Sequence, residues 1–155
     1  MTIEEKVVQK LIERKYHISF AESCTGGMCC AKIVNVSNAS SVLDMSFVTY
    51  ANEAKIDLLG VDSDVINKWG VVSEQAAGQM AIGVSKKSRA QVGVGVTGIA
   101  GPTGATEAKP IGMVCFGFCI NGNVSTYTMH FGNVGRNKVR CLSVDFVFEK
   151  LMELL

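Results

Sequence analysis

Apolar positions recur along the chain at two different intervals, and polar turn residues separate the segments. Spacings of three or four residues, together with capping residues, indicate helices, and runs of β-forming residues indicate strands. Helices are predicted at residues 3–15, 28–34, 53–59, 74–87 and 136–155. Strands are predicted at residues 18–21, 46–50, 91–96, 111–120 and 124–131.

Local signals define the ends of several of these segments. Thr2 and Glu5 have capping-box spacing before the first helix. Asn52 and Ser73 are the expected N-caps of the third and fourth helices. The dipeptide at residues 121–122, Asn-Gly, predicts a two-residue hairpin turn between the last two strands.

The order of the segments predicts the fold class. Helices alternate with strands, and one hairpin interrupts the alternation, which is typical of an α/β protein with a mixed sheet. We therefore expect a single three-layer α/β/α domain spanning residues 1–155. Residues 111–120 are apolar on both faces, which favours a strand covered on two sides. Ligands of such folds collect at the carboxyl ends of strands, and both glycine-rich turns of this chain lie there.

Composition restricts the classes of partner. The 155 residues are 48% hydrophobic and carry 15 basic and 14 acidic side chains, for a net charge of +1. This balance gives no support to a nucleic-acid or membrane-surface partner. The longest apolar stretch has about ten residues, whereas a membrane span needs about twenty. The N-terminus is acidic and unlike a signal peptide, so a cytoplasmic location is expected.

The six cysteines show no metal-binding pattern. They form no Cys-x-x-Cys pair, and both histidines lie far from them in the sequence, so zinc-ligand spacing is absent. We expect buried free thiols and no metal site. The cysteines are Cys24, Cys29, Cys30, Cys115, Cys119 and Cys141.

The first glycine-rich turn, residues 21–27, contains a candidate nucleophile. Ser23 follows a predicted strand, and the glycines after it allow several backbone N–H groups to face one point. Such a point suits an oxyanion or a phosphate oxygen. An equally good interpretation from the motif alone is a serine and threonine that cap a helix. Cys24 is a weaker rival nucleophile, because no histidine partner is evident.

A serine nucleophile needs a base, and the spacing leaves two solutions open. The sequence does not exclude His17 or His130 as this base. The alternative is Lys55, whose pKa would fall if its helical turn packed over Ser23 and removed the ammonium from water. Tyr50 would then relay a proton or orient the lysine. Taken alone, a lysine in a first helical turn is more typical of a solvated surface.

Two further features suit a ligand with a phosphate or carboxylate. The second glycine-rich turn, residues 96–104, follows a strand but is neither a dinucleotide fingerprint nor a Walker loop. It is either a ligand cradle or a plain surface turn. Arg136 and Arg140 lie one turn apart at the start of the last helix, where a guanidinium suits an anion. Two solvated arginines are an equally good interpretation.

Five blocks of sequence stand out together along the chain. They are AESCTGG at residues 21–27, FVTYANEAK at 47–55, GVVS at 70–73, VTGIAGP at 96–102 and KPIG at 109–112. These blocks resemble the CinA C-terminal-domain family, occur in the family's order and extend the resemblance from about residue 4 to 150. The family's characterised members are nicotinamide mononucleotide deamidases.

The resemblance implies a reaction and a role for each residue. Nicotinamide mononucleotide and water would give nicotinic acid mononucleotide and ammonia, a step of the pyridine nucleotide cycle in NAD metabolism. Ser23 would attack the carboxamide, Lys55 would take its proton and Tyr50 would assist. Arg136 and Arg140 would face the substrate phosphate. The residues expected to line the pocket are Thr25, Gly26, Gly27, Thr97, Gly98 and Gly101. The resemblance implies no metal or organic cofactor.

The sequence also leaves two alternative functions and the oligomeric state open. A non-catalytic nucleotide-binding module would keep the glycine turns without the chemistry. A competence- or DNA-damage-associated protein is a further alternative, although the near-neutral charge weighs against direct DNA contact. Relatives favour a homodimer, and the apolar C-terminus at residues 151–155 would suit such an interface or would pack on its own sheet.

Overall fold

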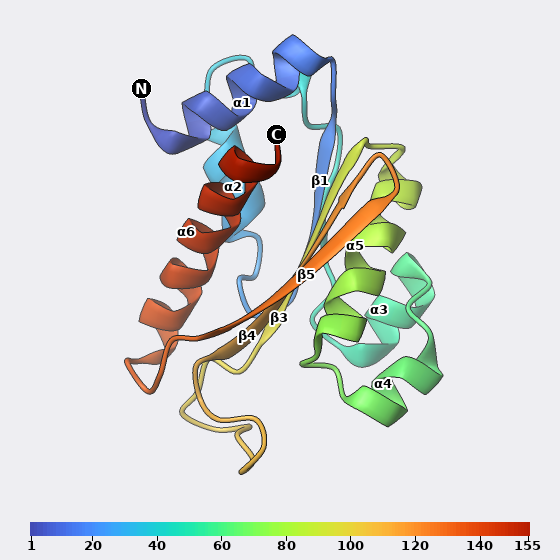
Figure 1. Ribbon diagram of the computed structural model, residues 1–155, viewed down its shortest axis with the longest axis vertical. Coiled ribbons are helices and arrows are strands. Elements are labelled where there is room, and N and C mark those ends of the chain that lie inside the picture. The colour runs from blue at the N-terminus through green and yellow to red at the C-terminus, as the bar shows by residue number, and fades with distance from the viewer.

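A five-stranded mixed sheet separates the helices into two layers in the computed structural model, which describes residues 1–155 (Figure 1). The strands lie in the order β2-β1-β3-β4-β5, with β1 parallel to both neighbours and β4 antiparallel to both of its own. The strands are β1 (Ile18–Glu22), β2 (Phe47–Val48), β3 (Val92–Gly98), β4 (Met113–Ile120) and β5 (Asn123–His130). The helices are α1 (Ile3–Arg14), α2 (Met28–Val34), α3 (Asn52–Leu59), α4 (Ser63–Trp69), α5 (Glu74–Ser88) and α6 (Arg136–Leu154), with a 3-10 turn at Ala39–Ser41. The predicted three-layer α/β/α fold is confirmed.

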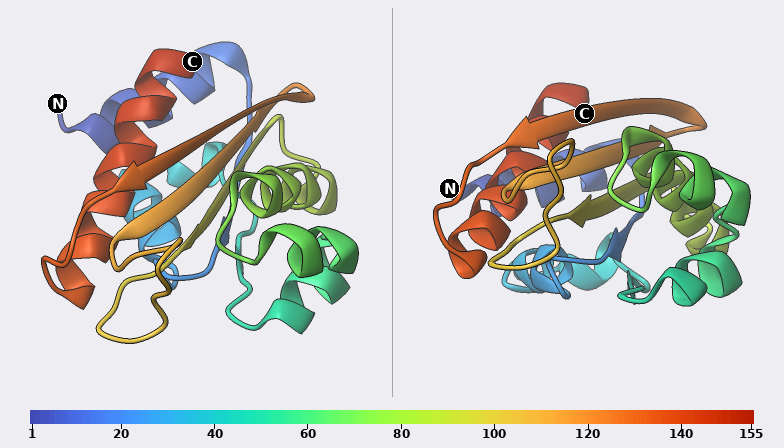
Figure 2. Two further views of the ribbon diagram at one scale, coloured as in Figure 1. Left: turned by 60° about the horizontal axis from the view of Figure 1, so that its bottom comes forward. Right: turned by 90° about the horizontal axis from the view of Figure 1, so that it is seen from below.

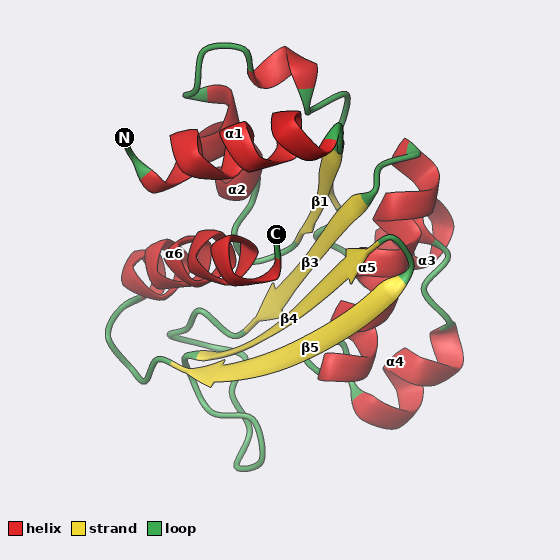
Figure 3. Cartoon of the chain, turned by 45° about the horizontal axis from the view of Figure 1, so that its top comes forward, coloured by secondary structure: helices red, strands yellow, loops and turns green.

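The two helical layers lie on opposite faces of the sheet. Helices α1, α2 and α6 cover one face, and α3, α4 and α5 cover the other (Figures 2 and 3). The main core lies under the first layer, where Phe20 of β1 stacks on Phe148 of α6 with ring centroids 6.3 Å apart. A second cluster forms beneath α3 and α5, with Met80 and Leu59 at its centre. Burial on both faces explains why β1 and β3 carry almost no exposed residues.

The backbone of helix α5 lies in close contact with the backbone of the sheet. A Cβ atom at Gly95 of β3 would lie 2.4 Å from the carbonyl oxygen of Ala77, and one at Gly117 of β4 would lie 2.2 Å from the same atom. Only glycine allows this approach. The close contact fixes the distance between α5 and the sheet, and α3 and α4 both pack against α5.

Several predicted boundaries are confirmed. Thr2 and Glu5 form the reciprocal capping box, and α2 has the bounds that the sequence predicts. The Ser73 hydroxyl accepts a hydrogen bond from the Ala76 amide at the start of α5. Asn121 and Gly122 have positive φ angles of 48° and 83°, as a tight hairpin turn requires.

Other predictions differ from the structure. Helix α4 was not predicted, because its one clear signal is the Asp62 cap before a seven-residue segment without a buried face. The N-cap of α3 is Ala51, and Asn52 is the first helical residue. Strand β2 keeps only two of the five predicted residues, because it pairs with β1 only at the end of that strand. Strand β3 extends through residue 98, since antiparallel pairing with β4 continues to that point.

The C-terminal residues pack on the protein's own core. Leu151 and Leu155 are buried, and Met152 and Leu154 pack against the same cluster. The Arg14 side chain donates a hydrogen bond to the carbonyl of the last residue. Of the two interpretations of this apolar end, packing on its own domain is confirmed, and the homodimer stays a prediction. No helix has the length and apolar character that crossing a membrane requires.

Candidate active site

Ser23 lies at the point where β1 gives way to a tight turn. Its backbone amide donates to the carbonyl of Val96 at 3.1 Å, which continues the pairing of β1 with β3 by one residue. Gly26 and Gly27 have positive φ angles of 59° and 101°, and α2 begins directly afterwards. The chain therefore reverses immediately after the serine, at the carboxyl end of the sheet.

Lys55 of α3 extends to this serine. Its Nζ lies 3.2 Å from the Ser23 Oγ and also donates to the carbonyls of Thr49 at 2.6 Å and Tyr50 at 3.2 Å. The residue is fully buried. The interpretation of Lys55 as a solvated surface lysine is therefore wrong, because α3 turns its first helical turn toward the sheet.

Burial changes the proton affinity of this lysine. Removal from water disfavours the charged ammonium and lowers the pKa of Lys55 to about 8, while the neighbouring Cys24 acts weakly in the opposite direction. No carboxylate lies within salt-bridge distance to stabilise the charge. A lysine with this pKa has a usable unprotonated fraction near neutral pH, which a general base needs.

Tyr50 contributes to the site through its main chain and its hydroxyl separately. Its carbonyl accepts from the Lys55 ammonium, whereas its largely exposed side chain points to α6. There the phenol oxygen accepts a hydrogen bond from Arg136 at 3.1 Å, and the same guanidinium donates to the Gly101 carbonyl at 2.9 Å. Arg136 thus joins the Tyr50 segment and the second glycine-rich turn at one edge of the site.

Arg140 of α6 contacts the serine turn from the face of the sheet opposite to α3. Its Nε donates to the carbonyl of Cys24 at 2.8 Å, and one terminal nitrogen donates to that of Thr25 at 3.4 Å. A Cβ at Gly26 would lie 3.2 Å from this guanidinium, so the glycine leaves it room. Neither arginine is merely solvated, since each has main-chain acceptors in the turns.

The rival nucleophile and the rival bases lie elsewhere or are poorly suited. Burial raises the pKa of the Cys24 thiol to about 11, which outweighs the lowering by its backbone hydrogen bond and by Arg140. A thiol with that pKa is a weak nucleophile near neutral pH. His17 pairs with Asp44 at 2.8 Å, and His130 lies exposed at the end of β5. No hydrogen bond joins either histidine to Ser23.

The remaining predicted pocket residues take different positions. Thr25 is fully buried, and its hydroxyl has no hydrogen-bond partner. Thr97 is buried in β3 and donates to the Val71 carbonyl at 3.0 Å, so it ties the strand to the segment before α5. At Gly98 a Cβ would lie 2.7 Å from a Val114 methyl group, which explains the glycine by strand packing.

Sequence reasoning missed two residues of this site. Glu22, directly before Ser23, is fully buried, and its carboxylate accepts backbone N–H groups of α2. Thr49 supplies the shortest acceptor to Lys55 and has an unpartnered buried hydroxyl. Glu22 carried a signal, since an acidic residue inside an otherwise apolar strand calls for an explanation. Thr49 carried none, because its contact is made by the main chain.

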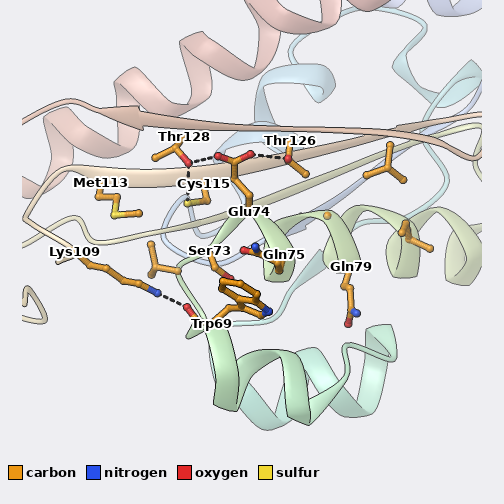
Figure 4. Close-up of a pocket in the computed structure, with 14 residues that line it drawn as sticks. Trp69, Ser73, Glu74, Gln75, Gln79, Lys109, Met113, Cys115, Thr126 and Thr128 are labelled. Atoms are coloured by element: carbon orange, nitrogen blue, oxygen red, sulfur yellow. Dashed lines mark hydrogen bonds between the residues drawn. The ribbon is translucent and has the colours of Figure 1, made fainter.

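A separate groove of about 690 Å³ lies on the α5 face of the sheet (Figure 4). Its polar end is Glu74, whose two oxygens accept hydrogen bonds of 2.7 Å from the hydroxyls of Thr126 and Thr128. These bonds lower the pKa of the Glu74 carboxyl. Neither Ser23 nor Lys55 lines the groove, and a carboxylate with a lowered pKa is a poor general base for the two threonine hydroxyls that it binds. The serine–lysine pair is therefore the better candidate for chemistry.

The cysteines are all free, and no cluster of three or more histidine, cysteine, aspartate or glutamate side chains is placed to hold a metal ion. The polar groups that converge at the carboxyl ends of β1 and β3 are hydroxyl, amine, guanidinium and main-chain groups. Their arrangement suits nucleophilic attack on a carbonyl carbon, with an anion held nearby.

Comparison with known proteins identifies relatives along the whole chain. The chain is 41% identical over 157 residues to a "CinA-like protein" of Kosmotoga olearia, covering 99% of this chain and 38% of that protein. It thus spans less than two-fifths of the length of this curated relative.

Solved structures of similar length resemble it closely. The competence/damage inducible protein CihA from Agrobacterium tumefaciens superposes with a TM-score of 0.91 at 39% identity, covering 99% of this chain and 96% of that one. A CinA superfamily protein from Escherichia coli gives a TM-score of 0.95 at 31% identity, covering 99% and 88%. The family profile described as CinA C-terminal domain matches residues 1–155. The chain therefore belongs to the CinA C-terminal domain family.

Proposed function

We propose that this protein hydrolyses the carboxamide of nicotinamide mononucleotide, with Ser23 as nucleophile and Lys55 as general base. The observation that carries the proposal is the 3.2 Å contact between the Ser23 Oγ and a fully buried lysine nitrogen. A serine hydroxyl is a weak nucleophile until a neighbouring base removes its proton. Lys55 is the one titratable side chain that contacts this hydroxyl.

The reaction divides into two acyl transfers. In the first, neutral Lys55 takes the Ser23 proton while Oγ attacks the carboxamide carbon. The resulting tetrahedral intermediate expels ammonia, which takes the proton from Lys55 and leaves an ester on Ser23. In the second, Lys55 deprotonates a water molecule that attacks the ester. The ester bond breaks, Ser23 regains its proton and the carboxylic acid leaves.

Free backbone donors are available for the oxyanion. The amides of Thr25 and Gly27 have no main-chain acceptor within the protein, whereas those of Gly26 and Met28 are used inside the turn. Preorganised N–H groups next to a nucleophile stabilise the charge that develops on the carbonyl oxygen. The serine turn therefore offers donors as well as the nucleophile.

The arginines support a substrate that carries an anionic group. Arg136 is exposed at the N-terminus of α6, and its guanidinium lies between the Tyr50 phenol and the Gly101 carbonyl. A planar guanidinium at a helix N-terminus favours a phosphate. Arg140 already has three hydrogen-bond acceptors, so we assign the phosphate contact to Arg136.

A binding module without catalysis is the competing function, and one experiment separates the two. The protein is titrated with nicotinamide mononucleotide by calorimetry, and the same mixture is assayed for ammonia and for nicotinic acid mononucleotide. The proposal predicts equal amounts of both products. Saturable binding without either product would contradict it and leave a nucleotide-binding module.

A further inference from the structure

We propose that Glu22 is a positioning residue that holds Ser23 and Lys55 in register for the reaction; this inference rests on the proposed function. Glu22 is the last residue of β1 and directly precedes the serine, and it is fully buried. It touches neither the Ser23 hydroxyl nor the Lys55 ammonium. Its effect on both is transmitted through backbone hydrogen bonds.

The side chain of Glu22 closes the serine turn. One carboxylate oxygen accepts the amide of Cys29 at 2.9 Å, and the other accepts the amide of Cys30 at 3.0 Å. Both amides belong to the first turn of α2, whose N-cap, Gly27, has no side chain to accept them. The carboxylate therefore replaces the missing cap and ties the end of β1 to the start of α2.

The turn needs this tie because it contains two adjacent glycines. Gly26 and Gly27 lie between Ser23 and α2, and glycine has the largest backbone freedom of any residue. Arg140 holds the carbonyls of Cys24 and Thr25, and the Glu22 carboxylate ties the far end of the turn to α2. Both contacts restrict the direction of the Ser23 side chain. A displacement of about 1 Å at a reacting group costs on the order of 100-fold in rate.

The main chain of Glu22 fixes the base. Its carbonyl accepts the amide of Thr49 at 2.9 Å, and the Thr49 carbonyl accepts the Lys55 ammonium at 2.6 Å. One residue thus connects the turn that carries the nucleophile with the segment that holds the base. Both carboxylate oxygens already accept hydrogen bonds from the α2 backbone, which suits positioning better than proton transfer.

The test compares Glu22→Gln with Thr2→Ala. The glutamine side chain retains one acceptor oxygen and places an NH₂ group against the second backbone N–H. Thr2→Ala removes the N-cap of α1, which is remote from the site, and so controls for the loss of a helix cap. Three quantities are measured: kcat and KM for nicotinamide mononucleotide, hydrogen exchange of the Cys29 and Cys30 amides, and the rate at which a fluorophosphonate modifies Ser23.

For Glu22→Gln we expect kcat to fall about 10- to 100-fold with KM changed less than about threefold. Faster exchange at Cys29 and Cys30 and slower Ser23 modification should accompany the loss, with β3 amides still protected. Thr2→Ala should leave all three quantities unchanged. Parent-like kcat or modification rates in Glu22→Gln, or equal losses in Thr2→Ala, would overturn the proposal.

The same measurements keep the two proposals apart. If the parent releases no ammonia, the proposed function fails, and the fluorophosphonate rate and amide exchange still decide the role of Glu22. If the parent is active and Glu22→Gln equals it, the positioning role alone fails.

Discussion

The side-chain nitrogen of Lys55 lies 3.2 Å from the hydroxyl oxygen of Ser23, although 32 positions separate the two residues in the sequence. The serine directly follows strand β1, and the lysine lies in the first turn of a helix on one face of the sheet. Their contact depends on the short strand β2, which brings Thr49 and Tyr50 alongside β1 so that their carbonyls receive the lysine.

The lowered pKa of Lys55 predicts the pH dependence of the reaction. The base acts in its neutral form, so kcat/KM should rise about tenfold per pH unit below pH 8 and level off above it. The measurement is kcat/KM for nicotinamide mononucleotide from about pH 6 to about pH 10. Lys55→Arg is the control, because a guanidinium stays protonated throughout and should give no active plateau. A parent profile that is flat across this range would contradict the assignment.

Substitution of the two arginines should have different kinetic effects on substrates with and without a phosphate. Arg136→Ala should raise KM for nicotinamide mononucleotide about 10- to 100-fold, since a charged hydrogen bond contributes roughly 1.5–3 kcal/mol. It should leave the riboside, which lacks the phosphate, unaffected. Arg140→Ala should instead lower kcat for both substrates, because Arg140 braces the carbonyls of Cys24 and Thr25. Steady-state kinetics on the two substrates tests this, and identical behaviour of the two variants would count against it.

Two glycines of α5 should respond differently to the same substitution. A Cβ at Gly83 would lie 2.0 Å from the Leu59 carbonyl oxygen of α3, whereas at Gly78 the nearest atom is a Thr126 methyl carbon at 3.2 Å. Gly83→Ala should lower the free energy of unfolding by about 1–3 kcal/mol through overpacking. Gly78→Ala should change it by less than about 1 kcal/mol, because helix propensity offsets the contact. Urea unfolding of both variants measures the difference, and equal values would show that α3 is not packed as described.

Much of the fold could be predicted because its signals are local. The Thr2–Glu5 capping box, the Ser73 cap and the Asn121–Gly122 turn each act within four residues of the position they define. Helix α4 and the shortening of β2 were missed, the latter because the length of β2 depends on its pairing with β1. A seven-residue helix without a buried face leaves little periodicity to detect.

The candidate site could be predicted only in part. Ser23 and Lys55 were identified, but spacing alone favoured a solvated lysine, because burial depends on how α3 packs and not on its sequence. Thr97 stays a predicted pocket residue, and its hydroxyl donates to the Val71 carbonyl, a contact that the sequence did not indicate. The acidic side chain of Glu22 beside an apolar strand was a signal, but its role was missed because its partners are backbone amides, which no side-chain motif records.

The decisive measurement is ammonia release from nicotinamide mononucleotide by the parent, Ser23→Ala and Lys55→Ala in parallel. Circular dichroism of each variant confirms that the fold is retained. We expect release by the parent and a loss of at least about 1000-fold in both folded variants, since nucleophile and base act as a unit. Full activity in Ser23→Ala, or a parent that binds the nucleotide and releases no ammonia, would contradict the proposed function.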